Sequence, residues 1–466
     1  MSSIAVNMDT ALQDTFASDG PLAEVVRPYQ VREGQLQMAK AVEWALKNES
    51  VLFCEAGTGT GKTLAYLIPA ILSGKKVIIS TATRALQEQI LSKDLLLVER
   101  ALKRRVSVAL MKGLGNYLCL RRFNEFRGSE HGSSAKWAGK LRVLDRWREE
   151  TETGDFSELA ALAEGDELIS HINSSSDTRV GPRCAYYADC FVTRMRKEAE
   201  SAQIVLVNHH LFFADLALRG PHPGRVLPDY DAVIFDEAHQ IENVATLFFG
   251  VRVSRRRVLT LLTEAERLLS AHSGTVFTTA PAQVANSAER FFESLRSSAR
   301  SHEPRVGLES GTWSGPAYQA YLELDTALEG LENAAEVLRG TPEDARDDKR
   351  GEGLDGVVRR CQSLRTALAT IVEGAPGRVA WLDTESAGLA LSSTPIDLAD
   401  TLRDAVFDRI PSVVLTSATL ATSHSAALDD ESQPFAFIRS RLGADTCEPE
   451  VNELLVPSPF DFKHNA

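Results

Sequence analysis

Short apolar runs and amphipathic stretches alternate along the first part of the chain. Val51–Cys54 is an apolar run that leads into a glycine-rich turn ending at Lys62. Helical apolar spacing follows over Thr63–Leu72, and a second apolar run occupies Val77–Ser80. This order is that of a βαβ unit, in which a helix joins two parallel strands. The pattern therefore predicts a parallel α/β sheet.

Three further apolar runs, Ile204–Asn208, Ala232–Asp236 and Ser412–Thr416, are typical of buried parallel strands. Two long insertions separate these runs, so the predicted sheet is assembled from distant segments. The first insertion, about Gly113–Glu200, is rich in arginine, lysine and cysteine. The second, about Val251–Ala390, has helical apolar spacing and is predicted to be mostly helical.

One stretch of the second insertion departs from helical spacing. Thr341–Gly356 is charged, contains glycine and has few apolar residues. Such a composition favours an exposed loop over a packed helix. We therefore expect a break in the helical pattern there.

The composition is that of a globular protein. The chain has 466 residues, of which 44% are hydrophobic and 25% charged, and its length suggests about three domains. The longest apolar stretch, Leu64–Leu72, is interrupted by Pro69 and is far shorter than the roughly 20 residues of a membrane span. The N-terminus has neither the basic nor the apolar region of a secretory signal. These features predict a cytoplasmic protein that does not enter a membrane.

The glycine-rich turn Ala56–Thr63 lies between a predicted strand and a predicted helix, which is the context of a phosphate-binding P-loop. Glycines allow backbone N–H groups to point at phosphate, a lysine supplies a cation for the β- and γ-phosphates, and a hydroxyl ligates Mg²⁺. Lys62 is the candidate catalytic cation. The residues predicted to bind ATP and Mg²⁺ are Gly57, Thr58, Gly59, Thr60, Gly61, Lys62 and Thr63.

Two carboxylates follow one another at the end of the predicted strand Ala232–Asp236. Asp236 and Glu237 open the sequence Asp-Glu-Ala-His, at the carboxyl end of a buried strand, where α/β sheets bind their ligands. Beside a P-loop, Asp236 is expected to hold Mg²⁺ and Glu237 to orient and deprotonate an attacking water. The pair therefore predicts nucleoside triphosphate hydrolysis.

In residues 29–466 these motifs resemble, in the same order, the front half of the DinG/YoaA-type, XPD-like iron-sulfur DNA helicases of superfamily 2. Ala56–Thr63 resembles motif I of that family, Asp236–His239 resembles motif II, and Arg32 with Gln35 resembles the adenine-reading Q motif. The resemblance implies a RecA-like P-loop NTPase domain that is interrupted by two insertions and uses ATP with Mg²⁺.

Two further segments resemble family motifs. Ser80–Thr83 with Gln87 is similar to motif Ia, which contacts the DNA backbone, so the resemblance implies that Thr83 and Gln87 bind DNA. Taken alone, Thr83 is equally well explained as the N-cap of a helix. Ser417–Thr419 is similar to motif III, which couples the nucleotide state to the grip on DNA. The resemblance therefore implies a coupling role for His239, Ser417 and Thr419.

The six cysteines are too sparse for a disulfide framework. Cys119, Cys184 and Cys190 resemble three of the four ligands of the family's 4Fe-4S cluster, and the fourth position is Arg179. A guanidinium cannot ligate iron because it stays protonated. The resemblance therefore implies an iron-sulfur insertion whose ligand set is incomplete.

Several interpretations of these cysteines remain open. The cluster is absent, is labile with three cysteine ligands, or uses Asp177 or His171 as a substitute. Otherwise the thiols are packed as small apolar groups, or they bind zinc.

DNA contacts are expected in local basic patches, because a net charge of -13 does not favour a bulk electrostatic grip on nucleic acid. The first insertion mixes cations, which follow a nucleic acid backbone, with aromatic rings, which stack on bases of single-stranded DNA. An equally good interpretation is a solvated helical face with Trp137 and Trp147 in a small core. The residues concerned are Arg121, Arg122, Phe123, Arg127, Lys136, Trp137, Lys140, Arg142, Arg146, Trp147 and Arg148.

The resemblance implies five segments. Helicase domain 1 is divided into residues 1–112, with the Q motif and motifs I and Ia, residues 201–250, with motif II, and its end in residues 391–466, with motif III. Residues 113–200 are the iron-sulfur-type insertion, and residues 251–390 are a helical Arch-like insertion. The last segment, 391–466, also contains the start of a second RecA-like domain. In the family that second domain begins where this sequence ends, and the Gln-x-x-Gly-Arg signature of its motif VI is not found.

We therefore expect the N-terminal part of a 5′-to-3′ ATP-dependent DNA helicase of DNA repair and damage tolerance, acting on single-stranded or forked DNA in the nucleoid. An arginine from the second lobe is worth about 10³ to 10⁵ in rate in such enzymes. The chain is therefore expected to bind nucleotide weakly and not to unwind DNA alone. The alternative is a catalytically silent nucleotide- and DNA-binding remnant that docks on a replication or repair protein.

Overall fold

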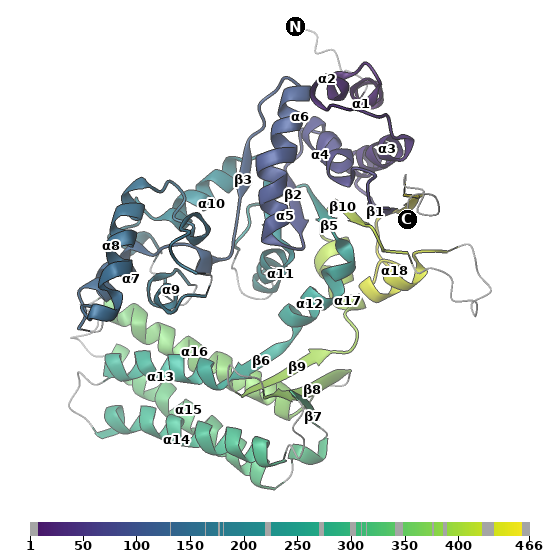
Figure 1. The fold of residues 1–466 in the computed structure, drawn as a ribbon. Coiled ribbons are helices and arrows are strands. Elements are labelled where there is room, and N and C mark those ends of the chain that lie inside the picture. The colour runs from purple at the N-terminus through teal and green to yellow at the C-terminus, as the bar shows by residue number, and fades with distance from the viewer. Residues whose placement is uncertain are drawn as a thin grey trace. The chain divides into compact units, whose positions relative to one another are not determined.

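The computed structural model of the chain describes residues 8–458, except 131, 164, 176, 177, 180, 220–224, 270–274, 299–303, 309, 314, 341–347, 375, 376, 385–388 and 422–432. The chain forms two compact units (Figure 1). The first comprises Met1–Ala245 and Leu398–Ala466, and the second comprises Thr246–Asp397.

A parallel sheet of seven strands forms the centre of the first unit, with the order β11-β1-β10-β5-β2-β4-β3. Its strands are β1 (Val51–Ala56), β2 (Val77–Thr81), β3 (Val108–Leu110), β4 (Ile204–Asn208), β5 (Ala232–Asp236), β10 (Ser412–Ser417) and β11 (Val451–Val456). Every pairing in it is parallel. The predicted parallel α/β sheet is therefore confirmed, and all five predicted strands lie within it.

The sequence pattern missed the two edge strands. β3 has only three residues, and β11 carries Asn452 and Glu453 among its apolar positions. An edge strand is covered less completely than a central one, so it does not need the continuous apolar run that identified the other five.

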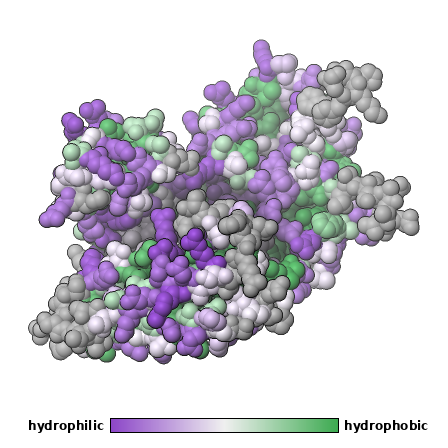
Figure 2. Space-filling model, turned by 60° about the horizontal axis from the view of Figure 1, so that its bottom comes forward, coloured by the Kyte–Doolittle hydropathy of each residue, from purple (hydrophilic) through white to green (hydrophobic). Residues whose placement is uncertain are grey.

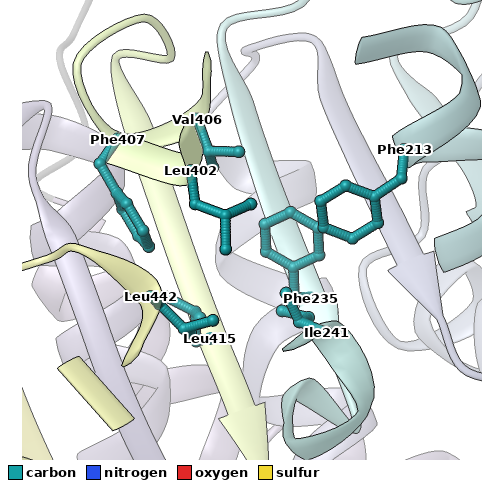
Figure 3. A pocket seen from close by; sticks show the side chains of 8 residues that line it. All are labelled: Phe213, Phe235, Ile241, Leu402, Val406, Phe407, Leu415 and Leu442. Atoms are coloured by element: carbon teal, nitrogen blue, oxygen red, sulfur yellow. The ribbon is translucent and has the colours of Figure 1, made fainter. Parts of the chain in front are cut away.

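Helices cover both faces of this sheet. Alternate strand positions such as Leu52 and Ile234 pack against helices on one face. On the other face, Phe235 and Leu415 pack against α11, α17 and α18 around a small apolar pocket (Figure 3). Outside residues 113–200, the helices described in this unit are α1 (Met8–Phe16), α2 (Pro21–Val25), α3 (Glu33–Asn48), α4 (Lys62–Leu72), α5 (Arg84–Gln89), α6 (Leu95–Ala101), α11 (His209–Leu218), α17 (Ala399–Leu402) and α18 (Ala436–Leu442), with α12 (Ile241–Phe249) at its boundary.

Residues 113–200 form a small helical region with its own apolar core. Its helices are α7 (Leu120–Arg127), α8 (Ala135–Glu150), α9 (Glu167–Ile172) and α10 (Phe191–Ser201). Phe123, Trp137, Leu144 and Leu168 lie at the centre of this core, each at most 1% exposed. We call this group of side chains and its neighbours the insertion core.

In its described residues, the second unit combines four long helices that follow the end of α12 with a four-stranded antiparallel sheet of order β6-β9-β8-β7. Its helices are α13 (Arg255–Leu269), α14 (Thr275–Ser298), α15 (Pro316–Arg339) and α16 (Asp348–Val372), and its strands are β6 (Val251–Ser254), β7 (Arg305–Leu308), β8 (Arg378–Asp383) and β9 (Ala390–Pro395). The helices agree with the predicted helical spacing. The strands were not predicted, because short segments such as Val251–Ser254 contain too few apolar residues to form a run.

The loop predicted over Thr341–Gly356 is wrong for its second half. α16 begins at Asp348, while residues 341–347 lie outside the described part of the chain. Leu354 and Val357 are fully buried in the core of this unit. A Cβ on Gly353 would lie 3.0 Å from Leu268 of α13, so the glycine that lowers helix propensity also lets the two helices approach closely. Packing therefore overrides propensity here.

Hydrophilic residues predominate on the face of the molecule in Figure 2, and hydrophobic residues occur there in small groups. Within the described ranges, no helix combines the length and the apolar character that crossing a membrane requires.

Candidate active site

The P-loop joins the end of β1 to the first turn of α4. Gly59 and Gly61 both have φ of 83°, a left-handed conformation that favours glycine. The Thr60 hydroxyl closes the turn by donating to the Gly57 carbonyl at 2.7 Å. Lys62 Nζ donates to the Ala56 carbonyl at 3.2 Å, so its ammonium lies over the loop. The predicted phosphate-binding residues thus form one turn at a helix N-terminus, where backbone N–H groups attract anions.

The two predicted Q-motif residues brace this loop. Arg32 donates through Nη1 to the Gly59 carbonyl, and Gln35 donates through Nε2 to the Gly61 carbonyl at 3.0 Å. Gln35 is only 4% exposed. A Cβ on Gly61 would lie 2.2 Å from Gln35 Nε2, so this contact also requires glycine. The structure places both residues at the P-loop. Their predicted recognition of adenine stays a prediction.

The ends of three neighbouring strands bring the remaining motifs together. In the order β1-β10-β5, β1 leads into the P-loop, β10 ends at Ser417 and β5 ends at Asp236. The Tyr66 hydroxyl of α4 donates to Asp236 Oδ2 at 3.1 Å and also interacts with the Thr63 side chain. Thr63 and Asp236, the two predicted Mg²⁺ ligands, therefore share one neighbour.

Asp236 is buried, at 6% exposure. Burial, together with the adjacent Glu237 carboxylate, raises its pKa to about 6, and the Tyr66 hydrogen bond and Lys62 offset part of that rise. A desolvated carboxylate with an acidic neighbour is stabilised by a divalent cation. The oxygen donors present therefore fit Mg²⁺, with Thr63 and Asp236 as the residues that would hold it.

Glu237 has an unusual backbone conformation, with φ of 58°. Such strain persists only where the surrounding structure holds it, and it is concentrated at functional sites. The Ser417 hydroxyl donates to Glu237 Oε2 at 3.3 Å and lies 2.8 Å from His239 Nδ1. Because a serine hydroxyl has one proton, the consistent assignment is that His239 donates to Ser417 and Ser417 donates to Glu237.

The Thr419 backbone N–H also donates to Ser417 Oγ, at 3.2 Å. The structure thus joins His239, Ser417 and Thr419, the three predicted coupling residues, through one hydroxyl group. We call the contacts among His239, Ser417 and Glu237 the His–Ser–Glu chain.

Three residues at this site were not predicted. Besides Tyr66, Glu55 accepts backbone hydrogen bonds from Leu420 at 2.6 Å and Ala421 at 2.7 Å. Ser458 donates to the Thr58 carbonyl of the P-loop at 3.0 Å. No residue pattern identifies these contacts, because they arise only when β10 and β11 pair with β1.

Gln87 lies differently from its prediction. Its side chain is fully buried, and Nε2 is 3.4 Å from the Met111 carbonyl. This burial conflicts with the prediction that Gln87 contacts DNA. Thr83 is exposed and caps α5 by accepting from the Leu86 N–H at 3.3 Å, so both interpretations of Thr83 remain compatible with the structure.

The basic and aromatic residues of the first insertion form a packed region. Trp137 and Trp147 are 1% and 8% exposed, so the small-core interpretation is correct and neither ring has a free face for a base. Several of the cations contact acidic side chains at 2.6 Å, as in the pairs Lys136–Glu167, Lys140–Asp166 and Arg127–Asp145.

The residues present do not fit a four-thiolate cluster. Cys119, Cys184 and Cys190 are half-buried, and within the described ranges no group of three or more histidine, cysteine or acidic side chains could hold a metal ion. Arg179 donates through Nη2 to Thr193 Oγ1 at 3.4 Å, and its buried Nη1 has no hydrogen-bond partner among the residues that the structure describes. Guanidinium groups offer donors but no lone pair for iron.

The two proposed substitute ligands can be located only in part. His171 stacks on Phe126 in the insertion core, with ring centroids 4.8 Å apart. Asp177 lies outside the described residues.

Known proteins resemble the chain over nearly its whole length. Residues 35–116 match the family model of the DEAD/DEAH box helicases. The ATP-dependent DNA helicase YoaA of Escherichia coli is 36% identical over 459 residues, which cover 98% of this chain and 68% of that protein. YoaA of Haemophilus influenzae is 31% identical over 98% of this chain and 68% of its own length. A Bacillus subtilis protein named 3′-5′ exonuclease DinG is 28% identical over 95% of this chain and 50% of its own length.

The match to the YoaA helicases covers 98% of this chain, a range that includes the P-loop, the acidic pair and the His–Ser–Glu chain. Together with the parallel sheet that carries these motifs, it shows that this chain belongs to the YoaA/DinG family of ATP-dependent DNA helicases.

Proposed function

We propose that the chain supplies the lobe of a 5′-to-3′ DNA helicase that binds and hydrolyses ATP, working on single-stranded or forked DNA in repair and damage tolerance. The main support for the proposal is that Asp236 and Ser417 end two neighbouring strands and that Lys62 contacts Ala56 at the end of the next strand. The polarity, the DNA structure and the pathway rest on the family resemblance.

Each residue has a distinct task in this proposal. Lys62 and the backbone N–H groups of Gly59 and Gly61 hold the phosphates, while Thr63 and Asp236 hold Mg²⁺, which neutralises phosphate charge when bound. Glu237 accepts the proton of the attacking water.

The His–Ser–Glu chain orients the Glu237 carboxylate in this proposal. Because Ser417 begins motif III and His239 ends motif II, a shift of either strand end changes that orientation. This gives the site a physical route by which DNA contact affects hydrolysis.

ATP hydrolysis by the 466-residue chain, measured with and without single-stranded DNA, tests the proposal. We expect slow turnover that DNA stimulates, and Lys62→Ala is expected to lower turnover by about 10²-fold or more, since it removes the cation from the phosphates. Lys47→Ala, which removes an exposed lysine of α3, is the matched control and should leave the rate unchanged.

Binding of a fluorescent ATP analogue separates the two candidate functions. Nucleotide binding without turnover in the presence of DNA would contradict the proposal and support the silent binding module instead.

Ser417→Ala is expected to separate binding from hydrolysis. The substitution removes the hydroxyl that links His239 to Glu237, so we expect kcat to fall about 10- to 100-fold while nucleotide affinity stays the same. Ser412→Ala, at the other end of β10 and equally buried, controls for loss of a strand hydroxyl. An equal loss of activity in both variants would show that the effect comes from the strand and not from the His–Ser–Glu chain.

A further inference from the structure

The three cysteines of the first insertion lie where separate segments meet. Cys119 is the N-cap of α7 and Cys190 is the N-cap of α10, while Cys184 follows the short helical turn Gly181–Arg183. In a cluster protein such segments are joined through the metal. In this chain they are joined by contacts between protein groups.

Protein contacts link α7 to the segment that precedes Arg179. The Cys119 N–H donates to the Ile172 carbonyl at 2.9 Å. Arg121 Nη2 donates to the Thr178 carbonyl at 2.7 Å, and Arg122 Nη1 donates to Asn173 Oδ1 at 2.8 Å. Guanidinium groups thus bridge these two segments.

Further guanidinium contacts attach α10. Arg179 Nη2 donates to Thr193 Oγ1 of this helix at 3.4 Å, and Arg194 Nη1 donates to the Glu152 carbonyl at 2.6 Å. Thr193 and Arg196 lie on one side of α10 because they are three residues apart. Among the described residues, the Nη1 of Arg179 and the Nε of Arg196 are both buried without a hydrogen-bond partner, so position 179 itself presents cationic donors and not a metal ligand.

Apolar packing and an ion pair secure the region further. A Cβ on Gly154 would lie 2.3 Å from the Phe191 ring, so α10 begins in close contact with the turn at Gly154. Lys112, whose side chain is 3% exposed, contacts Asp155 at 2.7 Å and Glu88 at 2.9 Å. Lys112, which directly precedes the insertion, thus joins Asp155 of the insertion to Glu88 of α5.

We infer that the first insertion of this chain folds and is held together without an iron-sulfur cluster. Arg179 occupies the fourth ligand position, and arginine contacts together with the insertion core take the place of iron-thiolate bonds. One guanidinium has five N–H donors in a planar fork and can therefore join several backbone segments. This inference is independent of the proposed ATP hydrolysis.

Iron binding by the full chain tests the inference. The chain is purified without oxygen, incubated with iron and sulfide, and desalted, and then iron content and visible absorption are measured. We expect no cluster absorption and a thermal midpoint that a chelator does not change. About four iron atoms per chain, with a midpoint that falls on chelation, would overturn the inference.

Two variants test the position of Arg179. Arg179→Cys completes a set of four thiols and is expected to gain iron and cluster absorption, whereas the matched variant Arg179→Ser is expected to stay iron-free. If Arg179→Cys also stays iron-free, the assignment of Arg179 to the fourth ligand position is wrong.

Limited proteolysis of the iron-free chain supplies a second readout. We expect residues 113–200 to resist cleavage under native conditions, because the insertion core and the arginine contacts hold them. Rapid cleavage within this region would show that it is not held without a cluster, and would overturn the inference.

Discussion

Replacing Asp236 with asparagine is expected to stabilise the chain at neutral pH and to remove its use of MgATP. The pKa of Asp236 is about 6 in the folded chain, above the ordinary value of roughly 3.9. Ionising this buried group therefore costs about 3 kcal/mol of folding free energy above pH 6. Asparagine avoids that cost but pairs less well with the Glu237 N–H and the Tyr66 hydroxyl, so we expect a net gain of about 1–2 kcal/mol.

The pH dependence follows from the direction of this pKa shift. Between about pH 4 and pH 6 the folded state binds more protons than the unfolded state, so wild-type stability falls as the pH rises through this range. The advantage of Asp236→Asn over wild type should therefore be full above about pH 6 and lost below about pH 4, where only the weaker pairing of asparagine remains and the variant is the less stable by about 1–2 kcal/mol. Urea unfolding without Mg²⁺, at both ends of this range, measures it.

Asp19→Asn is the matched control, because Asp19 is exposed. We expect this variant to change stability by less than about 0.5 kcal/mol. Asp236→Asn should also lose the stabilisation that MgATP provides to the wild type, because its Mg²⁺ ligand is gone. An Asp236→Asn variant that is less stable than wild type at neutral pH would contradict the argument.

Replacing Trp137 with alanine is expected to destabilise the chain by about 3–5 kcal/mol. Its indole is 1% exposed and contacts Phe126 edge to face, with ring centroids 5.9 Å apart. Trp44 of α3 is 39% exposed, so Trp44→Ala is the matched control, and we expect it to cost less than about 1 kcal/mol. Urea unfolding measures the two costs, and proteolysis locates the loss within residues 113–200.

The same pair of variants distinguishes packing from DNA stacking at Trp137. If the indole stacked on a base, Trp137→Ala would weaken binding of single-stranded DNA and leave the unfolding midpoint unchanged. Equal midpoints for Trp137→Ala and Trp44→Ala would therefore refute its role in the insertion core. Nucleotide binding should survive in both variants, because Trp137 lies in the first insertion and the exposed Trp44 lies more than two turns of α3 beyond Gln35.

Local pattern was enough to predict the central strands, the P-loop and the acidic pair. A buried parallel strand requires a continuous apolar run, and a phosphate-binding turn requires glycines at positions such as Gly59 and Gly61, so both leave a short signal in the sequence. The motif order then indicated the helicase family, which the comparisons confirm. These features depend on residues close together in the chain.

Features that depend on distant partners could not be predicted in this way. A helix pattern does not reveal that Gln87 and Trp137 face interiors, nor that Gly353 lets α16 pack against α13. Ser458 reaches Thr58 across 400 residues of sequence, because β11 pairs with β1.

The contacts at the centre of the candidate active site also depend on partners that are distant in the sequence. Tyr66 and Asp236, 170 residues apart, meet only because the sheet brings the end of β5 beside α4. The spacing of hydrophobic residues and the residue types in turns act within a few residues of the chain. The pairing of strands, in contrast, is determined by the packing of the whole unit. That packing decides which polar groups meet at the active site.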